Sequence, residues 1–171
     1  MKKIFLTKGY VATVDDSDFD KLNKFKWYCL LKGKLKYAVR NIQHPEGGFH
    51  KDGRSRRKRL SMHLELLPKK KGFITDHKDR NGLNNCRYNL RYATTSQNAT
   101  NSKVRKRKSV NGSAFRGVRR LKSGNWHSDI RYDRRRVCLG TFFMEEEAAK
   151  AYDIAAIKYH KEFASLNFNN L

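Results

Sequence analysis

The sequence predicts an α+β protein whose short strands and few helices form two parts on either side of a basic segment. Strand-like stretches lie near the N-terminus, at residues 4–14 and 27–42. Three more lie between residues 115 and 142, and a helical pattern follows them at 148–159. Between the two parts, residues 102–113 are rich in Lys and Arg and contain almost nothing apolar, as a linker does.

The charge of the chain predicts a polyanionic partner. Its 171 residues include 39 Lys and Arg against 16 Asp and Glu, a formal net charge of +23. Nucleic acid is the first candidate for such an excess. An anionic membrane surface is the alternative, but no apolar run approaches the ~20 residues of a membrane span. Because the N-terminus also lacks a signal-peptide core, we expect a cytoplasmic protein that uses no membrane.

Cysteine usage predicts neither disulfides nor a structural zinc site. The three cysteines, at 29, 86 and 138, are far apart and odd in number. No Cys-x-x-Cys pair occurs, and such pairs supply most structural zinc ligands.

The N-terminal region, residues 1–59, is predicted to be rich in β-structure. Residues 4–14 favour two strands around a turn at Lys8-Gly9, and acidic residues then precede a helical segment at 19–25. Residues 27–31 and 35–42 favour a hairpin, and residues 43–59 a polar loop.

The polar loop ends in a basic run that includes Arg56 and Arg57. A nuclear-localisation signal is one interpretation, but we favour contact with phosphates. The apolar spacing of residues 60–67 predicts a short helix that Pro68 stops. His63, inside that helix, is interpreted as a structural side chain or as one that supports a nearby site.

The stretch from Phe73 to Asn101 carries the chemistry. It places Asp76 directly before His77, Asn89 twelve residues after His77, and Asn98 nine after Asn89 (89 − 77 and 98 − 89). Asp and Asn offer hard oxygen ligands, which suit Mg²⁺ or a similar ion. A neutral His can take a proton from water near neutral pH. A metal, a base and an Asn that holds the base are sufficient to hydrolyse a phosphodiester.

This stretch resembles the HNH endonuclease motif of phage and intron-borne homing endonucleases. The matching segments are Asp76-His77, Asn84-Asn85, Asn89-Leu90-Arg91 and Asn98. The resemblance implies a ββα-metal module at residues 60–101 with one divalent ion, Mg²⁺ with Mn²⁺ as the alternative. It implies that Asp76 and Asn98 bind the metal and that His77 is the general base. It also implies that Asn89 positions that base or braces its loop, and that the cell is a bacterium or phage-infected.

A second module is predicted at residues 114–171. In the stretch 126–131, strand alternation places Trp126, Ser128 and Ile130 on one face and His127, Asp129 and Arg131 on the other. Acidic residues at 145–147 favour the start of a helix, and one apolar face of residues 148–159 can cover the sheet. The pattern predicts a three-stranded antiparallel sheet packed on one helix.

This module resembles the AP2 DNA-binding domain of plant transcription factors and phage homing endonucleases. The matching segments are Arg116-Gly117-Val118-Arg119, Gly124-x-Trp126, Ile130-Arg131, Leu139-Gly140-Thr141-Phe142, Glu147-Ala148-Ala149-x-Ala151-Tyr152-Asp153, Ala155-Ala156 and Leu166-Asn167-Phe168. The resemblance implies that the sheet enters the DNA major groove. The implied contacts are Arg116, Arg119, Arg120, Trp126, Arg131 and Arg136. Cys138 stands where plant members have a DNA-contacting Trp, so their base specificity does not transfer.

Together these features predict a homing-type DNA endonuclease that recognises its site as a monomer on double-stranded DNA. The basic linker at residues 102–113 is expected to follow the DNA backbone through Arg105 and Arg107. The alternative is a non-catalytic AP2-type transcriptional regulator with a degenerate HNH fold. The presence of Asp76, His77, Asn89 and Asn98 argues against it. A ribosomal or RNA-binding protein fits the charge but not the spacing of these residues.

Overall fold

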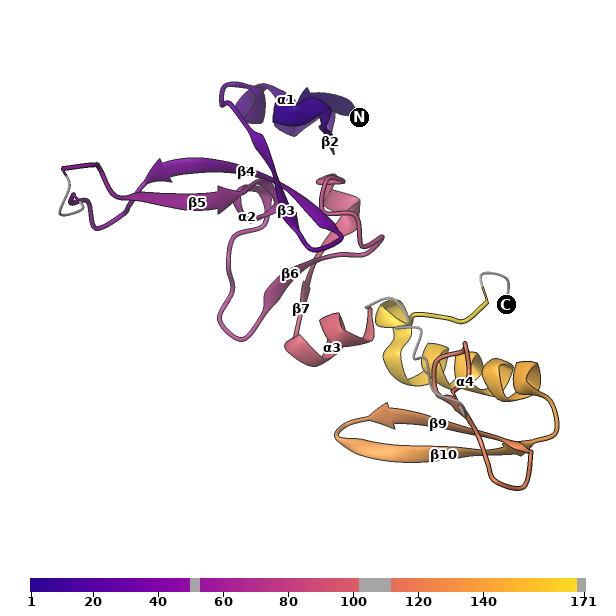
Figure 1. Cartoon of the computed structure of the whole chain (residues 1–171). Helices are drawn as coiled ribbons and strands as arrows, with labels where there is room; N and C mark the ends of the chain where they lie inside the picture. Colours follow the sequence, from indigo (N-terminus) through magenta and orange to yellow (C-terminus); the bar gives the residue numbers. More distant parts are fainter. Residues whose placement is uncertain (50–52, 102–111, 169–171) are drawn as a thin grey trace. The chain divides into compact units, whose positions relative to one another are not determined.

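The chain forms two compact units, residues 1–95 and 96–171, in a computed structural model that describes residues 1–49, 53–101 and 112–168 (Figure 1). Small antiparallel sheets and a few helices make up both units, so the predicted α+β class is confirmed. Arg105 and Arg107 lie outside the described residues. No helix in the described ranges is both long and apolar enough to cross a bilayer.

The first unit holds three small sheets connected by short helices. The sheets are β1-β2, β3-β4-β5 and β6-β7, and all strand pairs are antiparallel. The elements in chain order are β1 (Lys2–Phe5), η1 (Thr7–Gly9), β2 (Val11–Val14), α1 (Asp16–Asn23), β3 (Tyr28–Lys32), β4 (Leu35–Gln43), β5 (Arg57–Ser61), α2 (Met62–Leu66), β6 (Ile74–His77), η2 (Arg87–Asn89) and β7 (Leu90–Ala93). The short helix α3 (Thr95–Thr100) begins at the last residue of this unit and otherwise belongs to the second.

The two N-terminal hairpins form as predicted, but the basic run differs from its expectation. Residues 57–59 are not loop: they belong to β5, which pairs with β4 from Val39↔Ser61 to Gln43↔Arg57. The helix predicted at residues 60–67 therefore begins only at Met62. Pairing with β4 satisfies the backbone groups of residues 57–61, and this long-range partner overrides the local helical spacing.

One hydrophobic core runs through the whole first unit. It joins Ile4 and Leu22, near the N-terminus, to Met62 and Leu90, which lie far along the chain. Trp27 is part of the same core, and its indole Nε1 donates to the carbonyl of Leu22 at 2.8 Å. The N-terminal region and the segment that carries Asp76 and His77 therefore share their packing.

Strand β2 also binds directly to the loop between β6 and β7. The backbone of Thr13 donates to Leu83 at 2.9 Å and accepts from Asn85 at 2.8 Å. The Arg87 guanidinium donates to both carboxylate oxygens of Asp18, each at 2.7 Å. Asp18 is buried, whereas Asp16 and Asp20 on the same helix are exposed.

The second unit is a three-stranded antiparallel sheet covered on one face by a long helix (Figure 1). Its elements are β8 (Val118–Arg120), β9 (Trp126–Tyr132), β10 (Arg135–Phe142), α4 (Glu145–His160) and η3 (Lys161–Phe163), and the strand order is β10-β9-β8. Ser128 and Ile130 are buried, as the alternation of β9 predicts. Ile130 packs against the helix residues Tyr152 and Ala156.

Gly117 and Asp153 fix the edges of this unit. Gly117 has a φ of +73°, which disfavours any residue with a side chain. A Cβ there would also lie 2.0 Å from the Tyr152 ring, so the space excludes a side chain as well. The buried carboxylate of Asp153 accepts from the backbone amides of Asn167 and Phe168 at 2.8–3.0 Å. The C-terminal segment is thereby tied to α4.

The shared core predicts that the motif segment does not fold by itself. A fragment of residues 1–101 should unfold cooperatively on heating, whereas residues 60–101 should lack a cooperative transition. The shorter fragment loses Ile4, Leu22 and Trp27 from the core, and each buried side chain of this size contributes about 1.5–3 kcal/mol. Circular dichroism of both fragments during heating measures this difference. A cooperative transition in residues 60–101 would contradict the shared core.

Candidate functional site

The hairpin β6-β7 presents Asp76 and His77 at the end of its first strand. Asp76 lies directly across from Arg91, and His77 across from Leu90. All three polar side chains are buried, with exposures of 7% for Asp76, 6% for His77 and 8% for Arg91. Nε and Nη2 of Arg91 each lie 3.0 Å from Oδ2 of Asp76, so the carboxylate carries its own counter-ion.

The His77 ring is held by an amide that the sequence analysis did not assign a role. Nε2 of His77 lies 3.4 Å from Oδ1 of Asn85, and Nδ2 of the same amide donates to the Gly82 carbonyl at 3.5 Å. Asn85 is fully buried. Because an amide oxygen only accepts, Nε2 carries the proton and Nδ1 is the basic nitrogen. Burial lowers the pKa of His77, and the hydrogen bond with Asn85 offsets part of that shift.

Asn89 contacts the loop that follows His77. Its Nδ2 donates to Asp79 at 2.9 Å and to the Asn84 carbonyl at 2.8 Å, and its Oδ1 accepts from the Asp79 amide at 3.0 Å. Asp79 also accepts from the Asn84 side chain at 2.7 Å. Burial raises the pKa of Asp79, but these hydrogen bonds and that from the Asn81 amide outweigh it, so the pKa is lowered overall. Asp79 therefore acts as an ionised acceptor at the centre of the loop.

Two rings form one wall beside His77. Tyr37 of β4 lies 6.1 Å from the His77 ring and His63 of α2 lies 5.0 Å from it, between ring centroids. Gly82 lets the loop approach this wall, since a Cβ there would lie 2.5 Å from the Tyr37 ring. The β3-β4-β5 sheet, which carries Tyr37, thus contributes directly to the surroundings of His77.

His63 is a second buried imidazole beside His77. Its Nδ1 has no hydrogen-bond partner among the described residues. Burial, and then the nearby charge on His77, lower the pKa of His63 to about 4. His63 is therefore neutral wherever His77 works as a base.

The proposed metal ligands fall in different units of the chain. Asp76 is in the first unit, and Asn98 lies on α3 beyond the division after Thr95. Within the described ranges, no three or more His, Cys, Asp or Glu side chains gather as a metal cluster. The chemistry of the predicted donors still suits Mg²⁺ or Mn²⁺, because a carboxylate and an amide oxygen are hard ligands and Mg²⁺ keeps several waters.

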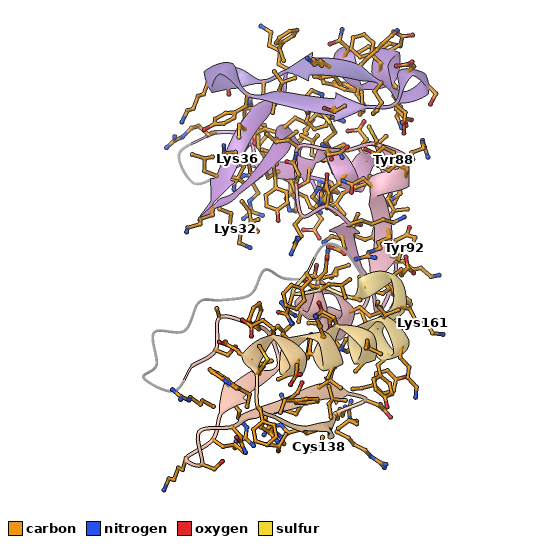
Figure 2. All side chains as sticks on the ribbon, turned by 90° about the vertical axis from the view of Figure 1, so that its right-hand side faces the viewer. Lys32, Lys36, Tyr88, Tyr92, Cys138 and Lys161 are labelled. Atoms are coloured by element: carbon orange, nitrogen blue, oxygen red, sulfur yellow. The ribbon has the colours of Figure 1, made fainter. Side chains whose placement is uncertain are left out.

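The outer face of the β8-β9-β10 sheet, opposite α4, is the basic surface of the second unit. Arg131 and Arg136 are cross-strand partners on it, and Arg119 pairs with His127 at its other end. Cys138, opposite Asp129, also lies on this face (Figure 2). Nε of Arg136 lies 3.0 Å from the Asp129 carboxylate and Nε of Arg119 lies 4.0 Å from it. Asp129 thus holds one Arg from each neighbouring strand.

The other predicted contacts lie elsewhere. Arg116 is half-buried and donates through Nη1 to the Thr100 carbonyl at 2.9 Å. Trp126 packs against the core of the second unit, and the Arg120 guanidinium lies 5.7 Å from its ring. In the first unit, Arg56 and Arg57 are exposed on or beside the edge strand β5. The outer face of the sheet therefore gathers Arg119, Arg131 and Arg136, whereas Arg116 and Trp126 lie elsewhere in the second unit.

Known proteins resemble both parts of the chain, although no family model matches it. The chain is 37% identical over 103 residues to the ethylene-responsive transcription factor ERF069 of Arabidopsis thaliana, covering 57% of this chain and 61% of that protein. It is also 37% identical over 76 residues to the Arabidopsis AP2/ERF and B3 domain-containing transcription factor RAV1, covering 44% and 21%. The chain thus spans less than two thirds of either plant protein.

A viral relative matches almost the full length. The chain is 29% identical over 161 residues to the uncharacterized HNH endonuclease L560 of Acanthamoeba polyphaga mimivirus, covering 94% of this chain and 76% of that protein. The relatives confirm the combined resemblance to HNH and AP2 proteins.

The buried His63 predicts a loss of stability on mild acidification. The pKa of His63 is about 4 in the folded protein and near 6.5 in the unfolded chain. Its contribution to the free energy of unfolding is therefore complete above pH 6.5 and decreases as pH falls towards 4. At pH 5 the loss reaches about 2 kcal/mol. His63→Phe keeps a flat ring but cannot bind a proton, so it should remove this acid-dependent loss of stability. Urea unfolding of residues 1–101 at pH 5 and pH 7.5, followed by Trp27 fluorescence, measures it. An equal drop in both proteins would contradict the assignment.

Proposed function

We propose that this chain is a site-recognising, metal-dependent DNA endonuclease, in which the first unit hydrolyses a phosphodiester bond and the second binds duplex DNA. The observation that carries the proposal is the buried pair Asp76-His77 at the end of β6, with the His77 ring held by Asn85. The near full-length similarity to a viral protein named an HNH endonuclease supports it.

His77 is suited to act as the general base. Burial lowers its pKa and so favours the neutral ring near pH 7. The bond to Asn85 leaves Nδ1 as the nitrogen that takes a proton from water. The hydroxide oxygen attacks phosphorus in line, the bond from phosphorus to the leaving 3′ oxygen breaks, and solvent protonates that oxygen. Asp79, fixed by Asn89 and Asn84, keeps the following loop in place.

Asp76 and Asn98 are the side chains we assign to a divalent cation, Mg²⁺ or Mn²⁺. When bound, such a cation stabilises negative charge that develops on the phosphate and the leaving group. Asp76 faces Arg91 at 3.0 Å, and its carboxylate supplies a hard oxygen donor.

The outer face of the second unit is suited to duplex DNA. Arg119, Arg131 and Arg136 project from three paired strands, whose side chains keep fixed directions. A fixed guanidinium can form the paired contacts that read a guanine edge in the major groove. Arg56, Arg57, Arg105 and Arg107 are proposed as phosphate contacts, which need no fixed direction. We propose that the chain acts as a monomer.

A second candidate function is transcriptional regulation without cleavage. The observation that favours it is the similarity of the chain to two Arabidopsis proteins named transcription factors. DNA binding is common to both candidates, so cleavage separates them.

Removal of the proposed base should separate cleavage from binding. His77→Ala should lower the rate of plasmid nicking in Mg²⁺ by about 10²–10⁴-fold, because a general base contributes that much. Duplex affinity should stay within a few fold, since the basic surfaces are intact. His44→Ala, which removes an imidazole from the segment after β4, is the matched control and should cleave normally. Wild-type cleavage by His77→Ala would refute the mechanism, and a wild-type protein that never cleaves would favour the regulator.

The outer face of the sheet should provide sequence discrimination. Arg131→Ala should weaken binding to the preferred duplex by about 1–3 kcal/mol. Its loss of affinity for random duplex should be smaller. Lys158→Ala is the control, because it removes the same charge from the exposed side of α4. Binding of both variants to both duplexes across a salt series gives the comparison. If the two variants behave alike, the outer face is not the reading surface.

A further inference from the structure

The ion pair between Asp76 and Arg91 is unusual in its position and in its geometry. Both partners are more than nine-tenths buried, and they face each other across the hairpin β6-β7. Nε and Nη2 of Arg91 converge on the single oxygen Oδ2 at 3.0 Å. This carboxylate precedes His77, the proposed base. The ion pair therefore sits inside the proposed site rather than at its edge.

Stability alone gives little reason for such a pair. Desolvation of two buried charges offsets most of their attraction, and well-packed apolar residues often replace a buried pair without loss. Loss of one partner is different, because it leaves a buried charge uncompensated. The Arg91 guanidinium therefore supplies the positive charge that the buried Asp76 carboxylate faces.

We propose that Arg91 is the resident counter-ion of Asp76 and that it sets how tightly this carboxylate binds a divalent cation. The inference rests on the proposed function, in which Asp76 is a cation ligand. Without a divalent cation, Arg91 holds the Asp76 carboxylate across the hairpin through two contacts of 3.0 Å. The Asp76 carboxylate already interacts with the Arg91 guanidinium. A divalent cation therefore binds it less tightly than it would bind the same carboxylate without Arg91.

The coupling is reciprocal. If Arg91 weakens the binding of a cation to Asp76 by a given free energy, a bound cation weakens the Asp76–Arg91 ion pair by the same free energy. Removal of the guanidinium therefore has two effects of opposite sign. The protein without a divalent cation becomes less stable, because the buried Asp76 carboxylate loses its ion pair with Arg91. The affinity of the same carboxylate for a divalent cation increases.

The experiment measures binding of Mn²⁺ to the full chain from the spin-resonance signal of the free ion. Arg91→Gln should bind Mn²⁺ at least roughly tenfold more tightly than wild type, since two charges at this distance interact by well over the equivalent of tenfold even at a high effective dielectric. Its melting temperature should fall in chelator and rise more steeply with Mn²⁺ than that of wild type. Arg59→Gln, which removes the same charge from the exposed edge strand β5, should leave Mn²⁺ affinity unchanged.

Asp76→Asn separates failure of this inference from failure of the proposed function. If Asp76→Asn removes Mn²⁺ binding but Arg91→Gln binds no more tightly than wild type, the inference is wrong and the proposed function stands. If Asp76→Asn binds Mn²⁺ as wild type does, Asp76 is not the ligand and the proposed function fails at this point. If Arg91→Gln stays unfolded even in saturating Mn²⁺, the pair is purely structural and the inference is overturned. Recovery of its fold in Mn²⁺ supports it.

Discussion

The first unit depends on the attachment of the motif loop to the N-terminal strands. Thr13 bonds through its backbone to residues 83 and 85, and Asp18 binds Arg87 through a paired guanidinium contact. Asn85, which holds the His77 ring, is thereby anchored to β2 on its backbone side and to His77 on its side-chain side. The orientation of the proposed base follows from this connection, because it fixes the position of Asn85 beside the His77 ring.

The sequence predicted the elements whose patterns are local. The hairpin of β3 and β4, the alternation in β9 and the helix α4 form close to the expected residues, since strand and helix periodicity depends on near neighbours. The strand β5 was missed because its partner is distant and its residues are basic, so only pairing with β4 reveals it. Arg119, Arg131 and Arg136 share one face, whereas Arg116 turns towards Thr100, a contact that no spacing predicts.

The candidate site shows the same limit in greater detail. The spacing of Asp76, His77 and Asn89 resembles that of a known motif, and this resemblance singled them out in the sequence. The hydrogen-bond partners within that motif were not predictable, since adjacent amides such as Asn84 and Asn85 differ only in where the fold directs them. Asn85 is fully buried and binds His77, while Asn84 binds the Asp79 carboxylate. Tyr37 and His63 come from elements outside the motif, so only the folded chain brings their rings to His77.

The core that joins Ile4 to Leu90 has a consequence for synthesis of the protein. The contacts between Asp15 or Asp18 and Arg87 connect residues 72 and 69 positions apart, and such non-local contacts form late in folding. At ~5–20 residues per second, roughly 4–17 s separate the synthesis of Ile4 from that of Leu90. During that interval the apolar faces of β1 and β2 lack part of their packing partners. Strands β1 and β2 therefore wait for their partners during synthesis, although in the finished protein they support the proposed catalytic residues.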